Sequence, residues 1–187
     1  IIGDPSNEST QLGALISSDH LEKVKEYVSI ARDDGGDFLT GGEDSKIRSL
    51  LPADLEGGYW MAPTVISGLS PESRCSTEEI FGPVVTVHQF KTEEEAIEIA
   101  NNTRYGLAGS VWTSDLEKGK RVAEGIRTGM VWVNTWLHRD LRTPFGGVGD
   151  SGVGREGGKW SLGFFSETLN VCIKPVSYTH LTLPTSR

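Results

Sequence analysis

The chain has 187 residues, of which 36% are hydrophobic and 24% are charged, so it is long enough for one domain, or slightly more, with a real core. A net charge of −8 argues against a nucleic-acid-binding surface, and the apolar runs are too short to span a membrane. Two cysteines do not make a disulfide framework, and four scattered histidines lack the spacing of metal ligands. We therefore expect a protein of a reducing, cytoplasmic setting without a bound metal.

The first half of the chain predicts one long helix followed by short strands. Ser17 and Ser18 are suitable N-cap residues for this helix, and the two glycines at residues 35–36 end it. Its buried face is expected from residues at three- and four-residue spacing, namely Leu21, Val24, Val28 and Ala31. Short strands are predicted at residues 38–40 and 59–66, and Pro63 restricts the second to an edge or a kink. The polar residues 43–58 between them predict a surface loop.

In the second half, predicted strands alternate with helices. Strands are expected at residues 84–90, 107–112 and 129–135, with helices at residues 92–101 and 114–126 between them. Thr92 and Glu95 have the spacing of a capping box, and Ser114 is the expected cap of the second helix. The buried side of that helix is expected from Leu116, Val122, Ala123 and Ile126. This order predicts parallel strands with right-handed crossovers, followed by a helix at residues 156–164 and a last strand at residues 168–174.

The most specific phrase in the sequence is Glu-Glu-Ile-Phe-Gly-Pro-Val at residues 78–84. It resembles the signature that aldehyde dehydrogenases carry at the nicotinamide end of their cofactor site. The resemblance implies that Glu79, an acceptor-only carboxylate, holds the ribose hydroxyls, that Phe81 contacts the nicotinamide ring and that Glu78 points away. The alternative interpretation is purely structural: the two glutamates would be a carboxylate pair at the start of a helix, and Phe81 would be a core residue. The implied cofactor is NAD, and NADP stays open because that choice is made in a dinucleotide-binding domain outside this sequence.

The resemblance extends from residue 1 to about residue 174. Matching stretches occur in the family's order at residues 3–5, 12–16, 41–42, 59–65, 101–108, 144–147 and 151–156. One departure is Gly149-Asp150, where many relatives carry a basic residue. The implied fold is α/β, with a parallel sheet and flanking helices in a partial catalytic domain over residues 1–165. Residues 166–175 would be a terminal oligomerisation strand, which implies a homo-oligomer, either a dimer or a tetramer.

The loop at residues 135–154 follows a predicted strand, where parallel sheets place their sites. In this family Phe145 would line the substrate tunnel. The stretch from Trp136 to Phe145 resembles the branch that acts on 2-hydroxymuconate and 2-aminomuconate semialdehydes, which carry a carboxylate. Guanidinium groups bind carboxylates in a bidentate manner, so Arg139 is the first candidate for the substrate contact and Arg142 the second. The alternative is that both arginines only pair with surface acids such as Asp140.

By the same resemblance, the nucleophilic cysteine, the glutamate general base and the oxyanion-stabilising asparagine precede Ile1. The chain would then hold no catalytic residue and be inactive alone. Cys75 lies in unrelated surroundings and Cys172 in the last predicted strand, so neither replaces the nucleophile. Residues 176–187 resemble a translated transposase adapter from DNA library preparation and are expected to be a non-native tail.

Other functions stay open at this point. One is a dehydrogenase of simple or betaine-type aldehydes, in which the arginines would face solvent. Another is a non-catalytic truncated module that oligomerises through its terminal strand. The acyl-phosphate reductases, which share the fold, are a more distant third.

Overall fold

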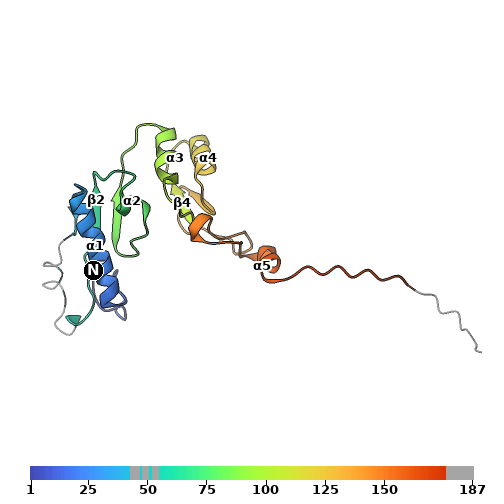
Figure 1. The fold of residues 1–187 in the computed structure, drawn as a ribbon, viewed down its shortest axis with the longest axis horizontal. Helices are drawn as coiled ribbons and strands as arrows, with labels where there is room; N and C mark the ends of the chain where they lie inside the picture. The colour runs from blue at the N-terminus through green and yellow to red at the C-terminus, as the bar shows by residue number, and fades with distance from the viewer. Residues whose placement is uncertain (43–46, 48–50, 52–54, 176–187) are drawn as a thin grey trace, which may run out of the picture.

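The computed structural model describes residues 1–42, 47, 51 and 55–175, arranged as two lobes and an extended terminal segment (Figure 1). The first lobe contains α1 (Ser18–Asp33), β1 (Asp37–Thr40), β2 (Thr64–Ser67), α2 (Arg74–Thr77) and β3 (Val84–Val87). The second contains α3 (Glu93–Asn101), β4 (Ala108–Val111), α4 (Leu116–Gly125), β5 (Met130–Val133), the 3-10 helix η4 (Gly149–Ser151) and α5 (Gly158–Phe165). Most of the predicted loop at residues 43–58 and the whole predicted tail at residues 176–187 lie outside the described residues.

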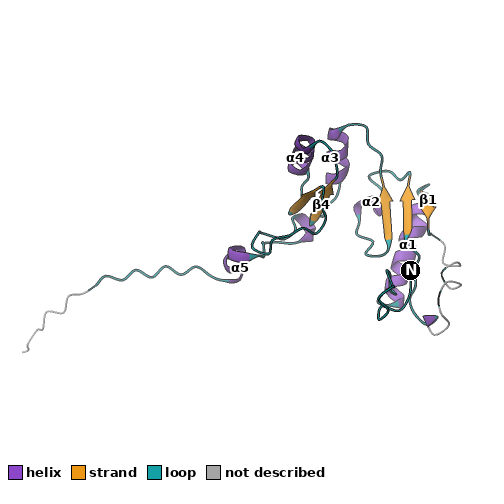
Figure 2. Cartoon of the chain, turned by 180° about the vertical axis from the view of Figure 1, so that it is seen from behind, coloured by secondary structure: helices purple, strands orange, loops and turns teal. Residues whose placement is uncertain are grey.

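The described strands form two small sheets (Figure 2). In the first sheet β2 lies between β1, which is antiparallel to it, and β3, which is parallel to it. In the second sheet β4 pairs with β5 in parallel. The predicted α/β class with parallel pairing is confirmed, but the expectation of one succession of parallel strands is wrong. After β3 the chain crosses to the second lobe, so β3 pairs with β2 and not with β4.

Pro63 does not restrict its strand to an edge of the sheet. The strand is shorter than predicted and begins at Thr64, directly after the proline, so the missing proline N–H removes no ladder hydrogen bond. As a result β2 is the central strand of its sheet. Thr64 is buried, and its hydroxyl accepts from the Gly42 amide at 3.0 Å, which ties the turn after β1 to the start of β2.

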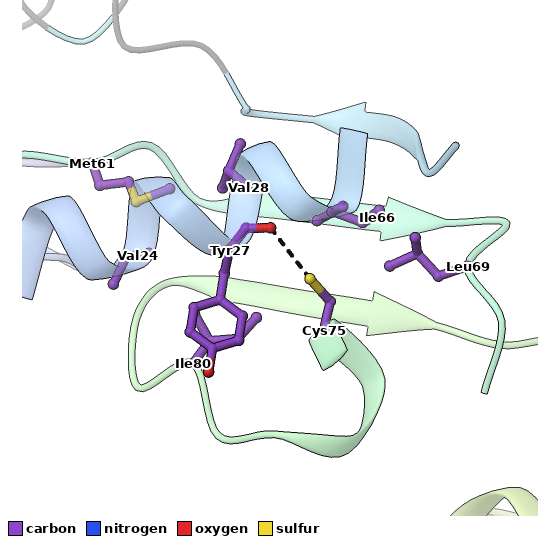
Figure 3. Packing of buried hydrophobic residues seen from close by; sticks show 9 residues of the cluster. Val24, Tyr27, Val28, Met61, Ile66, Leu69, Cys75 and Ile80 are labelled. Carbon is purple, nitrogen blue, oxygen red and sulfur yellow. Dashed lines mark hydrogen bonds between the residues drawn. The ribbon is translucent and has the colours of Figure 1, made fainter. Parts of the chain in front are cut away.

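The core of the first lobe is built on one face of α1 (Figure 3). The predicted residues Val24, Val28 and Ala31 are buried, as is Tyr27, which the prediction omitted. Ser17 caps this helix by accepting from the His20 amide at 3.1 Å. The buried partners of α1 come from β2 and the segments around it, namely Met61, Ile66, Leu69, Cys75 and Ile80. The short helix α2 carries Cys75 and was not predicted.

In the second lobe one predicted cap is confirmed and one is wrong. The Thr92 hydroxyl accepts from the Glu95 amide at 3.2 Å, as a capping box requires, while the Glu95 carboxylate accepts from the Lys91 amide at 2.7 Å. Helix α4 is capped by Asp115 and not by Ser114, because the Asp115 carboxylate reaches the Lys118 amide at 3.0 Å. The helix therefore begins one residue later, and Leu116 is exposed where we expected it to be buried.

The predicted strand at residues 168–174 is not formed among the residues that the structure describes. Residues 167–175 run extended away from both lobes and belong to neither sheet of the described residues (Figure 1). Their apolar side chains alternate with polar ones, and Leu169, Val171 and Ile173 are all exposed. A strand requires a hydrogen-bonded neighbour, and the described part of the chain supplies none here. Pairing with another subunit therefore stays a prediction.

We predict that Ile66→Ala destabilises the first lobe by about 2–5 kcal/mol, because it leaves a cavity at a fully buried position in the central strand. Urea denaturation followed by far-ultraviolet circular dichroism measures the change. The matched control is Ile16→Ala, at a side chain that is 89% exposed, which should change the free energy of unfolding by less than about 0.5 kcal/mol. Equal effects of the two variants would contradict this description of the core.

Candidate active site

The Glu78–Gly82 segment is held against one side of helix α1. Four α1 side chains contact it, from residues at helical i, i+3, i+4 and i+7 positions: His20, Lys23, Val24 and Tyr27. Gly82 lies so close to the helix that a Cβ there would come within 2.7 Å of Val24 Cγ2. Ile80 is buried in the core behind the helix. The packing of α1 therefore determines where the segment lies.

Glu78 is bound by protein groups on the α1 side. The Tyr27 hydroxyl donates to its carboxylate at 2.6 Å, and the Arg74 guanidinium donates at 3.1 and 3.2 Å. These hydrogen bonds, that of Arg74 above all, hold the pKa of Glu78 below its usual value, and the carboxylate in turn raises the pKa of Tyr27. Glu78 thus anchors the segment to Tyr27 and Arg74.

Glu79 and Phe81 lie on the opposite, open side. Exposure alternates along the segment, since Ile80 is buried whereas Glu79 is exposed and Phe81 is 70% exposed. The Glu79 carboxylate has no hydrogen-bond or ion-pair partner among the residues that the structure describes; only its backbone carbonyl accepts, from Lys23. An unpaired acceptor beside an exposed aromatic ring suits the ribose hydroxyls and the planar ring of a nicotinamide nucleotide. Glu79 and Phe81, the two residues predicted to bind the cofactor, are thus accessible to a ligand.

Glu79 lines a cleft of about 560 Å³ between the two lobes. One wall comes from residues 76–79 of the first lobe, and the other from the ends of α3 and β4 and from η4. The lobes are joined beside this cleft, where the Asn102 side-chain amide donates to the Pro71 carbonyl at 2.9 Å and the Thr103 hydroxyl to the Thr77 carbonyl at 3.3 Å. Thr77 and Thr103 both line the cleft, so their hydrogen bond holds its two walls together.

At Gly149-Asp150, where the sequence departs from many relatives, both residues contact Arg104. Asp150 pairs with Arg104 at 3.3 Å, and its amide donates to the Arg104 carbonyl at 3.0 Å. Gly149 has a φ of +58°, and a Cβ there would come within 2.3 Å of the same carbonyl oxygen. The acidic residue and its glycine therefore fit Arg104, whereas a basic residue at position 150 would face a like charge.

Arg139 and Phe145 lie in direct contact. The Arg139 guanidinium is 4.0 Å from the centre of the Phe145 ring and pairs with Glu156 at 3.2 Å. Its side chain is only 28% exposed. Phe145 is fixed by two backbone hydrogen bonds with Glu156, of 2.9 and 2.8 Å. This arrangement presents a held, partly buried cation next to an aromatic ring.

Arg142 has a different environment. Its side chain is 87% exposed and binds Asp140, two residues away, through several hydrogen bonds that lower the pKa of Asp140. The structure therefore brings Arg139 and Phe145 together and leaves Arg142 at the surface with the partner that the alternative reading gave it.

The cleft at Glu79 adjoins a second cavity, at Phe145. Phe145 lines a second cavity of about 310 Å³, together with glycines of the loop before α5 and with Phe164 and Phe165. Leu107 and Ser151 line both this cavity and the cleft at Glu79. The Ser151 hydroxyl accepts from the Gly106 amide at 2.9 Å, which fixes the shared wall. The two cavities therefore share residues of one wall.

Cys75 does not have the properties of a nucleophile. Its thiol is buried and donates to the Tyr27 carbonyl at 3.2 Å, and burial raises its pKa, which disfavours the thiolate. Cys172 is exposed on the terminal segment, outside both cavities. Across the described residues there is no cluster of His, Cys, Asp and Glu side chains that could hold a metal. None of the described helices is long and apolar enough to cross a membrane.

Sequence reasoning found the exposed pair but missed the groups that place it. His20, Tyr27 and Arg74 were not singled out. The helical spacing of His20 and Tyr27 with Val24 was a usable signal, because it puts polar side chains at the border of a face already known to be buried. Nothing in the sequence pointed to Arg74, because the short helix that carries it has no periodic pattern.

The structure thus places the unpaired Glu79 carboxylate in an interlobe cleft of an α/β scaffold, and comparison with known proteins gives the family. The profile of the aldehyde dehydrogenase family matches residues 1–171, and this chain belongs to that family. It is 51% identical to a 2-aminomuconic 6-semialdehyde dehydrogenase of a Pseudomonas species over 91% of its own length and 34% of the relative's. It is 48% identical to a 2-hydroxymuconic semialdehyde dehydrogenase of Pseudomonas putida over 92% of its length and 35% of the relative's.

Solved structures show the same fold. The betaine aldehyde dehydrogenase of Staphylococcus aureus, crystallised with NAD+, superposes with a TM-score of 0.80 at 38% identity, over 88% of this chain and 32% of that one. The chain thus spans about a third of the length of the relatives that it matches.

We predict a pH dependence that reports the Glu78 anchor. Because the pKa of Glu78 is lowered on folding, its contribution to stability is complete above its usual value of 4.5 and is lost as the pH falls through the lower folded-state pKa. Glu78→Gln should therefore be less stable than the wild type at pH 7, and the two denaturation midpoints should converge as the pH falls below the folded-state pKa of Glu78. Glu98→Gln, on the α3 surface, is the control and should follow the wild type throughout. A constant gap between wild type and Glu78→Gln at every pH would contradict the anchor.

Proposed function

We propose that this chain is the nicotinamide- and substrate-lining part of an NAD(P)-dependent aldehyde dehydrogenase that oxidises an aldehyde to a carboxylic acid. The observation that carries the proposal is the unpaired Glu79 carboxylate beside the exposed Phe81 ring, on a segment anchored from behind by Glu78 and Ile80. Among family members of known structure, the betaine aldehyde dehydrogenase was crystallised with NAD+, which favours NAD for this chain as well.

The chain's own residues would bind and orient. Glu79 accepts hydrogen bonds from the ribose hydroxyls, and charge-assisted bonds of this kind are about twice as strong as neutral ones. Phe81 limits the positions open to the nicotinamide ring. When bound, NAD accepts a hydride from the substrate carbon. The nucleophile and general base come, by the family resemblance, from a region that precedes Ile1.

Glu79→Gln should weaken NADH binding by about tenfold in the protein expressed from the source DNA extended upstream of Ile1, because a neutral amide loses the charge-assisted bonds. NADH fluorescence titration gives the dissociation constant. Glu124→Gln, an exposed change on α4, is the matched control and should leave it unchanged. If the two variants bind NADH equally well, Glu79 is not a cofactor ligand. If the extended protein binds neither NADH nor NADPH, the dehydrogenase proposal fails and the non-catalytic oligomerisation module takes its place.

The proposed substrate is a semialdehyde that also carries a carboxylate, of the muconate type. The relatives named for such substrates are 51% and 48% identical to this chain, against 38% for the betaine aldehyde dehydrogenase. Arg139 would take the substrate carboxylate at the edge of the Phe145 pocket. Its guanidinium has five N–H donors, and Glu156 is bound through only one of them, so a second carboxylate can be accommodated.

Arg139→Lys should lower kcat/KM for a carboxylate-bearing semialdehyde by about 10- to 100-fold, because a lysine cannot form the bidentate pair. For an uncharged aldehyde of similar size kcat/KM should change by less than about threefold. Arg142→Lys is the matched control, since Arg142 is exposed and bound to Asp140, and it should spare both substrates. Equal losses with both aldehydes would show that Arg139 supports the pocket without reading the carboxylate.

We also propose that the whole protein is a cytoplasmic homo-oligomer. The exposed alternating side chains of Leu169, Val171 and Ile173 have the pattern of a strand that pairs across a subunit boundary. Light scattering of the protein expressed from the source DNA extended upstream of Ile1 would give its molar mass. That mass, divided by the mass of one subunit, distinguishes a dimer from a tetramer.

A further inference from the structure

Phe81 has a backbone conformation that bulky residues avoid. Its φ is +61°, in the left-handed region, where the Cβ of an L-residue crowds the following carbonyl. The residue after it is Gly82, which could have taken this conformation without strain. A strained residue persists only where its surroundings hold it, and such residues cluster at functional sites. The contacts that hold Phe81 are therefore informative.

His20 makes those contacts. Its ring Nε2 lies 2.6 Å from the Phe81 carbonyl oxygen, and its ring meets the Phe81 ring edge-on with centroids 6.0 Å apart. A carbonyl oxygen only accepts, so Nε2 must carry the proton and donate. His20 itself is fixed, because it lies in the first turn of α1 and its amide donates to the Ser17 cap. The donor is thus attached to the most firmly packed helix of the first lobe.

The flanking residues leave Phe81 little freedom once this hydrogen bond forms. Ile80 is buried in the core, and Gly82 is pressed against Val24. Both ends of the Phe81 backbone are therefore held, and the carbonyl between them is oriented by His20. Since the ring is 70% exposed, core packing contributes little to its direction. The backbone conformation sets the direction of the Cα–Cβ bond, and the edge-on contact with the His20 ring adds to it.

We propose that His20 is a positioning residue for the cofactor site: its Nε2–H holds the Phe81 carbonyl, keeps Phe81 in the left-handed conformation and so aims the ring at the nicotinamide. The inference rests on the proposed function for the identity of the ligand. The hydrogen bond and its effect on the backbone do not depend on it. A residue at position 20 must then supply a donor that reaches the Phe81 carbonyl.

The test compares His20→Gln, which keeps a side-chain N–H donor, with His20→Leu, which keeps bulk without a donor. In the 187-residue chain, nuclear magnetic resonance reads the φ of Phe81 from backbone couplings and the protonated ring nitrogen of His20 from 15N shifts. We expect the Nε2–H form in the wild type. The left-handed population of Phe81 should fall by about fivefold in His20→Leu, the value of a typical hydrogen bond, and be retained in His20→Gln.

A wild-type ring protonated at Nδ1 alone would overturn the proposal, as would an unchanged φ at Phe81 in His20→Leu. The protonated ring nitrogen of His20 is observed in the wild-type chain. It therefore shows whether Nε2 is the donor even if His20→Leu fails to fold. The second readout is NADH affinity in the upstream-extended protein, which should fall about fivefold in His20→Leu and recover in His20→Gln. If Phe81 leaves the left-handed conformation in His20→Leu but the protein still binds NADH with wild-type affinity, the positioning role is overturned. Absence of NADH binding by the wild type itself would instead overturn the proposed function.

Discussion

The packing of one side of helix α1 against the Glu78–Gly82 segment is the contact on which the candidate site depends. The segment has no strand or helix structure of its own, so its backbone must be held by tertiary contacts. Val24 and Ile80 supply apolar burial, and Tyr27 supplies a hydrogen bond to Glu78. Because these contacts act on alternate residues, the remaining ones are turned outward. Without the contacts from this face of α1, nothing in the segment itself would fix the orientation of Glu79 and Phe81.

The two adjacent glutamates show how environment assigns different roles to the same side chain. Glu78 is bound by Arg74 and Tyr27, and its lowered pKa keeps it charged and engaged. Glu79 has no such partner in the described part of the chain and retains its full capacity to accept hydrogen bonds from a ligand. The two arginines show a comparable division: Arg139 is held against Phe145 and Glu156, whereas Arg142 pairs with a neighbouring aspartate at the surface.

Local rules predicted the parts of the fold that local chemistry determines. The caps at Ser17 and Thr92 and the buried face of α1 follow from side-chain hydrogen bonding and helical period, and both are confirmed. The pairing of β3 with β2 was not predicted, because it depends on where the chain turns after β3 and not on the strand's own residues. The cap at Asp115 was missed since Ser114 and Asp115 are both good caps and only the geometry separates them. The prediction of a strand at residues 168–174 rests on alternation alone, and alternation does not say which strand, if any, would pair with it.

At the site, motif resemblance gave Glu79, Phe81, Arg139 and Phe145, but not the reason for their orientation. That reason lies in contacts between residues some 50 to 60 positions apart, such as Tyr27 with Glu78 and His20 with Phe81. A single sequence carries no direct signal for such pairs. The left-handed conformation of Phe81 was equally hidden, because an aromatic residue before a glycine gives no reason to expect it.

The most direct test is a crystal structure, with NAD bound, of the protein expressed from the source DNA extended upstream of Ile1. We expect that both oxygens of Glu79 lie within hydrogen-bond distance of the nicotinamide ribose hydroxyls, that Phe81 faces the nicotinamide ring and that Glu78 remains bound to Arg74 and Tyr27. NAD bound away from the interlobe cleft, or Glu78 released from Tyr27 to take the ribose in place of Glu79, would contradict this expectation.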